Sequence, residues 1–255
     1  MKKALAVGAL FTLSVGTANA LDFSITPVVG SFQQKANYRK DDGEEGKVKY
    51  DGTFYGLKIG LGHSFGNVRL EGDLSAYYVG DGNVKVEPSD YTSSKYKHVE
   101  LQGEGRVGYK YDRFEGNLKG VAIAGYIPIG YSFRKMDVDY LDENTDGSYS
   151  DDYKYLYTGL GMRLEYKMLY LDGKVLLPLK NKVKLDKSYA GEGSIEKDMG
   201  KKVGYNVSAG IKWKLLTAGV FYERREHKSF YDHIDRYTAS NGKEERLGLQ
   251  VGFVF

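Results

Sequence analysis

The last twelve residues constrain the fold of this chain more than any other segment. They read EERLGLQVGFVF, and the large apolar side chains all fall on one face: Leu247, Leu249, Val251, Phe253 and Phe255. Alternation with a period of two is the pattern of a β-strand whose two faces meet different environments. In an outer-membrane barrel the apolar face contacts lipid, and the small or polar face lines the lumen.

The amino terminus predicts export. Residues 1–20 carry two lysines, a short apolar run and a terminal Ala-Asn-Ala, which is the pattern of a secretory signal peptide with its cleavage site. The apolar run is too short to serve as a membrane-spanning helix. Residues 21–255 contain no cysteine and so cannot form the disulfide bonds that stabilise small exported domains. They are therefore expected to form one large cooperative domain.

The charge balance argues against a nucleic-acid partner. The chain has 37 Lys and Arg against 34 Asp and Glu, a net charge of +3, whereas binding to phosphates requires a clear excess of cations. The 33 Gly and 23 Tyr favour curved strands with aromatic girdles over helices. Together with the export signal, this composition predicts the outer membrane of a Gram-negative bacterium.

Alternating segments of about ten residues recur along the chain between turn residues. The clearest is 68–78, where apolar side chains alternate with Arg69, Glu71 and Asp73. Short turns alternate with long polar connections, which lie near 33–50, 79–97, 134–154, 180–202 and 226–243. The pattern predicts an all-β fold, a closed antiparallel up-and-down transmembrane β-barrel of about ten strands, with eight or twelve as alternatives. A soluble β-sandwich is a further alternative, but its strands need no such asymmetry in their connections.

The second face of these segments predicts a charged lumen. The candidate network consists of Arg69, Glu71, Asp73, Glu100, Glu104, Arg106, Arg163, Glu165, Asp172, Lys174, Glu223, Arg225 and Arg246. Lys58, His98, Lys212 and Glu244 fall on the same face, which without His98 holds eight basic and eight acidic side chains. A selective pore would favour one sign. Balanced charge in a narrow barrel instead predicts interlocked salt bridges that occlude the lumen, and a small diffusion pore is the alternative.

This architecture resembles that of bacterial outer-membrane β-barrel proteins, which commonly close on a strand ending in Phe. The resemblance implies that Phe255 is the signal read by the barrel assembly machinery. It also implies contact with outer-membrane lipid and lipopolysaccharide, and outer loops that meet external ligands. We expect a monomer whose loops carry its biology.

One stretch resembles a particular family of such barrels. Residues 229–235, SFYDHID, are similar to the last outer loop of the omptins, which are ten-stranded outer-membrane proteases. Omptins carry an Asp-x-Asp pair around the second outer loop and an Asp-x-His pair around the fourth, which together activate a water. Here Asp81 and Asp90 are isolated in the second loop, and the fourth has Asp186 but no His. Without an imidazole there is no evident general base, so we expect no catalytic residues. A diverged omptin-type protease is the alternative.

The third long connection contains the opening of a calcium loop. Asp142, Asn144 and Asp146, followed by Gly147, match the pattern D-x-[DN]-x-[DN]-G, in which alternate oxygens converge on the ion. The Glu expected at the twelfth position is replaced by a Tyr, so Asp152 is the candidate fourth ligand. The sequence predicts at most a weak structural calcium site and no other cofactor. A solvated acidic loop with a Gly turn is the alternative.

Overall fold

The computed structural model describes residues 22–40, 45–87, 94–142, 145–185, 194–228, 230–232 and 237–255. The predicted signal peptide lies outside these residues, as do parts of the long connections and of the omptin-like stretch. No helix among the described residues is long and apolar enough to cross a membrane.

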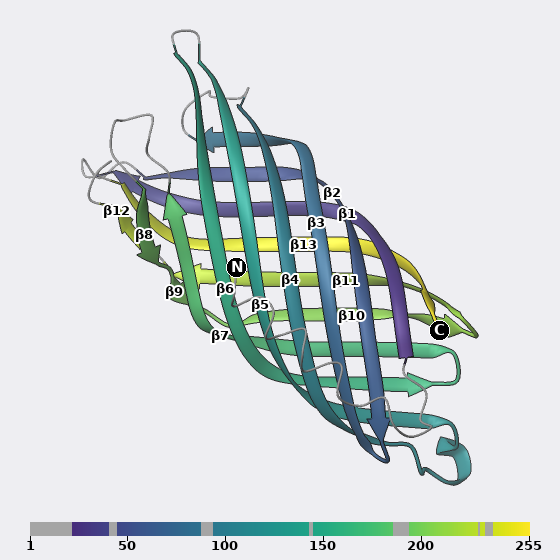
Figure 1. Ribbon diagram of the computed structural model, residues 1–255. Helices are drawn as coiled ribbons and strands as arrows, with labels where there is room; N and C mark the ends of the chain where they lie inside the picture. Colours follow the sequence, from purple (N-terminus) through teal and green to yellow (C-terminus); the bar gives the residue numbers. More distant parts are fainter. Residues whose placement is uncertain are drawn as a thin grey trace, which may run out of the picture.

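Antiparallel strands make up almost all of the described chain (Figure 1). The barrel strands are β1 (Asp22–Lys40), β2 (Glu45–Phe65), β3 (Val68–Glu87), β4 (Ser94–Tyr111), β5 (Val121–Asp142), β6 (Thr145–Tyr166), β7 (Leu169–Leu185), β10 (Gly204–Trp213), β11 (Leu216–Lys228) and β13 (Tyr237–Val254). Three short strands accompany them at one end, β8 (Ile195–Asp198), β9 (Gly200–Lys201) and β12 (Phe230–Asp232). A single turn of 3-10 helix, η1 (Gly116–Leu118), precedes β5.

The ten barrel strands close on themselves. Each pairs with its neighbour in the chain, β10 follows β7, and β13 pairs with both β11 and β1. The two ends of the described chain meet in this seam, where the backbone N–H groups of Phe23 and Phe255 donate to each other's carbonyl oxygens over 3.1 and 2.7 Å. Closure matters because a sheet edge in lipid would leave backbone groups without hydrogen bonds. The predicted count of ten strands is confirmed.

An apolar belt surrounds the outside of the barrel. Its side chains are exposed although they are large and hydrophobic, as with Leu74 at 67%, Leu160 at 66% and Leu249 at 58%. At the end of the chain the five apolar residues of the predicted outer face, from Leu247 to Phe255, are all exposed, while Arg246, which precedes Leu247, is 2% exposed. The predicted orientation of the last strand is therefore confirmed. A closed barrel with such a belt is built for lipid on the outside, and it belongs to the outer membrane.

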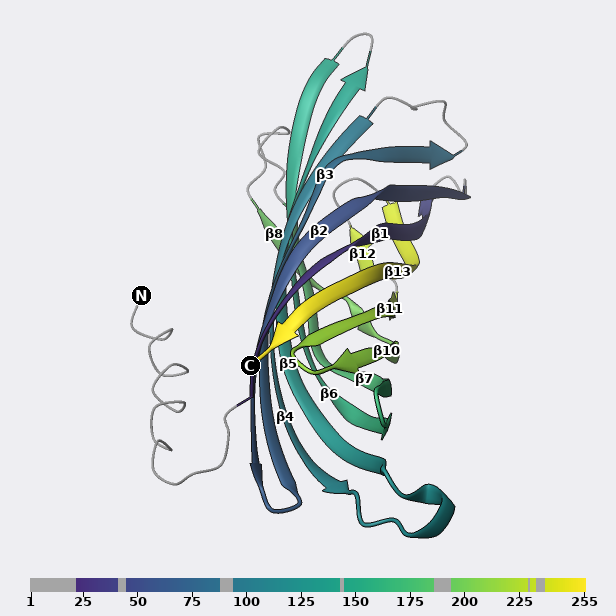
Figure 2. The ribbon, with the colours of Figure 1, turned by 90° about the vertical axis from the view of Figure 1, so that its right-hand side faces the viewer.

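The two ends of the barrel differ. At one end three connections are tight turns, in which Gly66, Lys167 and Lys214 adopt positive φ, and the β4–β5 connection is a short segment that contains η1. At the other end the hairpins project, and the β5–β6 hairpin extends farthest (Figures 1 and 2). Strand pairing continues well into the predicted long connections, for example to Asp142 of β5. These segments thus form hairpin arms, because the inward positions of the arms, such as Met136 and Val138, are apolar and pack against each other.

Candidate functional site: the barrel lumen

The lumen holds all thirteen residues of the predicted charged network. They lie on the inward face of β3, β4, β6, β7, β11 and β13, alternating with the lipid-facing side chains. Two groups of ion pairs can be distinguished. We call the group around Glu100, near the arms, the outer cluster, and the group around Glu71 and Glu104, near the tight turns, the inner cluster.

Glu100 is the centre of the outer cluster. It is fully buried, and it accepts hydrogen bonds from Arg225 Nη1 at 2.9 Å, from Ser132 Oγ at 2.8 Å and from Arg246. Arg225 also pairs with Glu223 at 2.7 Å. Buried charges of this kind need such partners because their desolvation is costly. The cluster joins β4, β5, β11 and β13 across the lumen and fixes the distance between opposite walls.

Two further members of the outer cluster extend the predicted network. Arg134, on β5, is 5% exposed and pairs with Glu244. Glu244 also accepts a hydrogen bond of 2.6 Å from Arg246 Nη2. The sequence placed Glu244 on the inward face but missed Arg134, because the alternation of this segment is ambiguous in phase. The usable signal was the alternation of Ile129, Tyr131 and Phe133 with Gly130, Ser132 and Arg134, which puts Arg134 on the inward face.

The inner cluster is built on two carboxylates. Both carboxylate oxygens of Glu104 accept hydrogen bonds from Lys174 Nζ, at 2.6 and 2.5 Å. Glu104 also accepts hydrogen bonds from Arg106 Nε at 2.5 Å and from the Tyr157 hydroxyl. Glu71 contacts three guanidinium groups, those of Arg69 at 2.6 Å, Arg163 at 3.0 Å and Arg106 at 3.3 Å.

The remaining predicted members lie at the edge of the inner cluster. Asp73 pairs with Arg106 at 2.7 Å, and Asp172 pairs with Arg163 at 2.7 Å. Glu165 is farther from the others and reaches Lys110 at 3.5 Å. The structure therefore brings the predicted charges together as pairs of opposite sign.

An aromatic layer fills the lumen beside the outer cluster, which the sequence did not predict. It is composed of buried apolar side chains from Val28, Phe32, Tyr50, Phe54, Tyr77, Val79, Val84, Tyr96, Met136, Val138 and Phe221. The ring of Phe54 fits against Gly30 and Gly248, where an added Cβ would come within 2.8 and 2.9 Å of it. Part of the signal was weak, because Val28, Tyr77 and Phe221 have apolar neighbours and give no contrast between the two faces. Tyr96 and Val138 do alternate with charged residues, but they lie in segments predicted to be connections.

A cavity of about 290 Å³ occupies the half of the lumen near the tight turns. Residues at its mouth, such as Asp22, Gly62 and Val254, lie at the turn ends of their strands. Its opposite end is bounded by Tyr77 and Phe221 of the aromatic layer. The lumen is thus wide at one end and packed at the other. We call this cavity the vestibule.

The histidines of the described residues are dispersed. His98 is 2% exposed and packs edge-on against Phe32, with ring centroids 4.5 Å apart, and His63 lies near a tight turn. His227 lies beyond the apolar belt, because the outward side chains next to it are those of Glu226 and Lys228. Burial lowers the pKa of His227 to about 4. His233 lies outside the described residues.

The predicted calcium ligands lie along the β5–β6 arm. Asp142 pairs in register with Thr145, and Asp146 with Leu141, so both belong to the tip of the hairpin, while Asn144 lies outside the described residues. Asp152 pairs with Lys135, six residues along the strand from Asp146, a separation of about 20 Å at the usual rise of a strand. Among the described side chains there is no group of acids and histidines arranged for a metal ion. Calcium binding at the tip stays a prediction.

The comparisons with known proteins concern the fold. No protein-family model and no curated protein sequence matches the chain. Its fold is similar to that of the outer membrane protease OmpT from Escherichia coli, with a TM-score of 0.53 and 12% identity over 93% of this chain and 99% of that one.

Two further barrels are less similar. The translocator domain of the autotransporter NalP from Neisseria meningitidis gives a TM-score of 0.44 at 11% identity, over 100% of this chain and 95% of that one. An outer membrane channel from Pseudomonas putida F1 gives 0.42 at 13% identity, over 95% of this chain and 98% of that one. The fold of this chain is that of a ten-stranded outer-membrane β-barrel.

Proposed function

We propose that this protein is a closed, non-enzymatic outer-membrane barrel that holds hairpin arms at the cell surface for contact with lipopolysaccharide or other external macromolecules. The observation that carries the proposal is the packing of the outer half of the lumen, where the outer cluster and the aromatic layer lie side by side. Phe32 of the aromatic layer contacts the outer cluster directly, because the guanidinium of Arg246 lies 5.8 Å from the centre of its ring.

The charge pattern supports a sealed lumen over a selective pore. Acids and bases alternate and pair across the barrel, as Glu100 does with Arg225 and Arg246. A selective pore needs a ring of one sign facing water. Paired charges buried among aromatic rings resist hydration, because opening a path would separate each charge from its partner. The barrel then serves as a rigid mount for the arms.

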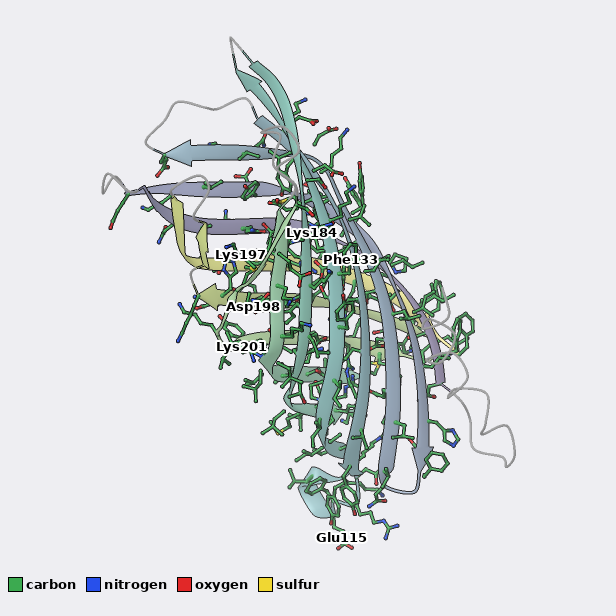
Figure 3. The ribbon with its side chains drawn as sticks, turned by 60° about the vertical axis from the view of Figure 1, so that its left-hand side comes forward. Glu115, Phe133, Lys184, Lys197, Asp198 and Lys201 are labelled. Atoms are coloured by element: carbon green, nitrogen blue, oxygen red, sulfur yellow. The ribbon has the colours of Figure 1, made fainter. Side chains whose placement is uncertain are left out.

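Lysines on the outer wall support contact with lipopolysaccharide. Lys154 and Lys182 share one carboxylate, Glu196 of β8, and Lys180 is exposed directly beyond the lipid-facing Leu179. Figure 3 shows Lys184, Lys197 and Lys201 near the same end, opposite Glu115. Cations at this height, just above the apolar belt, match the level of lipid phosphates. We call Lys154, Lys180 and Lys182 the collar lysines.

The first experiment tests closure. Refolded protein in planar bilayers is expected to give no steady conductance. Steady single-channel steps would overturn the closed barrel and favour a small diffusion pore. The similarity to OmpT makes cleavage of basic peptides a necessary second assay, and turnover that is lost on unfolding the barrel would overturn the non-enzymatic part of the proposal.

The second experiment tests surface contact. Binding of purified lipopolysaccharide to folded protein in detergent is compared between wild type and Lys180→Glu/Lys182→Glu. The variant is expected to bind more weakly. The matched control is Lys119→Glu/Lys214→Glu, which reverses two exposed lysines at the opposite, tight-turn end of the barrel. Equal binding by all three proteins would remove the role of the collar lysines.

A further inference from the structure

The vestibule has two unlike walls. The wall formed by β3, β4, β6 and β7 carries the inner cluster. The wall formed by β1, β2, β10, β11 and β13 carries short inward side chains, among them Ser24, Thr26, Gly60, Ser208 and Thr217. These short side chains leave the cavity of about 290 Å³ open beside the ion pairs, near the lower end of the sizes of small-molecule sites.

The acids of the vestibule are all engaged by cations. Each of its seven carboxylates has a basic partner within 4.0 Å, in the pairs Asp22–Arg69, Glu71–Arg69, Asp73–Arg106, Glu104–Lys174, Glu165–Lys110, Asp172–Arg163 and Glu223–Arg225. The carboxylates therefore leave little uncompensated negative charge for an incoming cation.

Three lysines that line the vestibule form no ion pair with a carboxylate within the described part of the chain, namely Lys58, Lys167 and Lys212. The Nζ of Lys167 lies 5.1 Å from the centre of the exposed Tyr166 ring, so Lys58 and Lys212 are the two whose amines remain for the cavity. Lys58 lies at the closed end, where its Nζ is 4.3 Å from the centre of the Phe221 ring. Lys212 lies at the mouth, next to the β10–β11 turn. Lys58 and Lys212 thus place an unpaired amine at each end of the cavity.

We propose that the vestibule is a binding site for a small periplasmic solute that carries phosphate or carboxylate groups. Lys58 and Lys212 supply the ionic contacts, since ammonium groups bind oxyanions as point charges. Ser24, Thr26 and Gln250 line the same space and supply hydrogen bonds to the rest of the solute. The site faces the periplasm, because the short turns of outer-membrane barrels lie on that side. It goes beyond the surface contact proposed above, so either proposal can fail without the other.

The binding test is calorimetry on folded protein in detergent, with pyrophosphate and citrate as the two probes. Replacement of both lysines, Lys58→Gln/Lys212→Gln, is expected to weaken binding about tenfold for each amine removed. The matched control is Lys97→Gln/Lys135→Gln, two exposed lysines on the outside of the barrel, which should bind as wild type does. A preference for pyrophosphate or citrate identifies the anionic group. No binding to wild type, or equal binding by both variants, would overturn the site.

A second measurement needs no variant. Wild-type protein is acylated at lysine with and without pyrophosphate, and the modified positions are measured by mass spectrometry. Lys58 and Lys212 are expected to be protected, while Lys97 is labelled equally in both conditions. Unchanged labelling of Lys58 and Lys212 at a pyrophosphate concentration that saturates calorimetric binding would place the ligand elsewhere and overturn the assignment.

Discussion

Removing the carboxylate of Glu104 should destabilise the barrel more than any change at the edge of the inner cluster. The Glu104 side chain is 2% exposed and that of Lys174 is 7% exposed. Both oxygens of Glu104 contact Lys174 Nζ, and among the described residues this is the one carboxylate within 4.0 Å of that amine. Glu104→Gln therefore leaves a buried ammonium group without a counter-ion, which typically costs about 3–5 kcal/mol.

A double-mutant cycle separates the stranded charge from the lost pair. Lys174→Met alone should cost a similar amount, because it strands Glu104 beside a single remaining cation, Arg106. Glu104→Gln/Lys174→Met removes both charges and should recover much of the loss. The control is Glu165→Gln, because its side chain is 28% exposed and its contact to Lys110 is 3.5 Å long. That variant should lose less than about 1 kcal/mol.

The assay is equilibrium unfolding by denaturant in detergent micelles. The fluorescence of Trp213 reports it, since this is the single tryptophan of the chain and is 55% exposed on the lipid-facing wall. If Glu104→Gln, Lys174→Met and Glu165→Gln all remain within 1 kcal/mol of wild type, the inner cluster is hydrated. That result would contradict the burial of Glu104 and Lys174 described above.

Three further outcomes follow from other parts of the barrel. Leu249→Arg should impair folding, because an arginine facing lipid costs about 2–4 kcal/mol near mid-membrane, and the loss is measured as loss of heat-modifiable gel mobility. The control is Gln250→Arg, whose side chain faces the vestibule. Equal damage by the two variants would mean that the orientation of β13 is the reverse of the one described. Millimolar calcium should protect the tip of the β5–β6 arm from protease nicking in wild type, and identical nicking in Asp142→Ala/Asp146→Ala with or without chelator would leave a solvated acidic loop. The pKa of His227 falls from 6.5 to about 4 on folding, so the stabilising effect of the neutral imidazole is present above pH 6.5 and is lost as the pH falls to 4. His227→Gln should therefore lose less unfolding free energy than wild type over that pH interval. An equal loss in the two proteins would contradict the burial of the imidazole.

The sequence determined which side of most strands faces lipid. Alternation along the last strand distinguishes Leu249 from Gln250 without knowledge of any neighbour, since successive side chains of a strand point to opposite faces. The same argument gave the number of strands and the inward placement of charges such as Glu104. It failed at Arg134, because the phase of the alternation in that segment is ambiguous, and at Phe54, because an inward aromatic residue beside the outward Tyr55 gives no contrast between the two faces.

Only the tertiary structure decided which inward residues meet. Glu104 and Lys174 are 70 positions apart in the chain, and no pattern within either strand records the other. Their contact depends on the tilt and stagger of ten closed strands and on local irregularities, such as the register shift of β3 between Val79 and Gly82. Alternation is a local property of the backbone, whereas contact across a lumen depends on the closure of the whole barrel. The sequence therefore specified a charged interior. The closed fold specified the ion pairs, the aromatic layer and the vestibule.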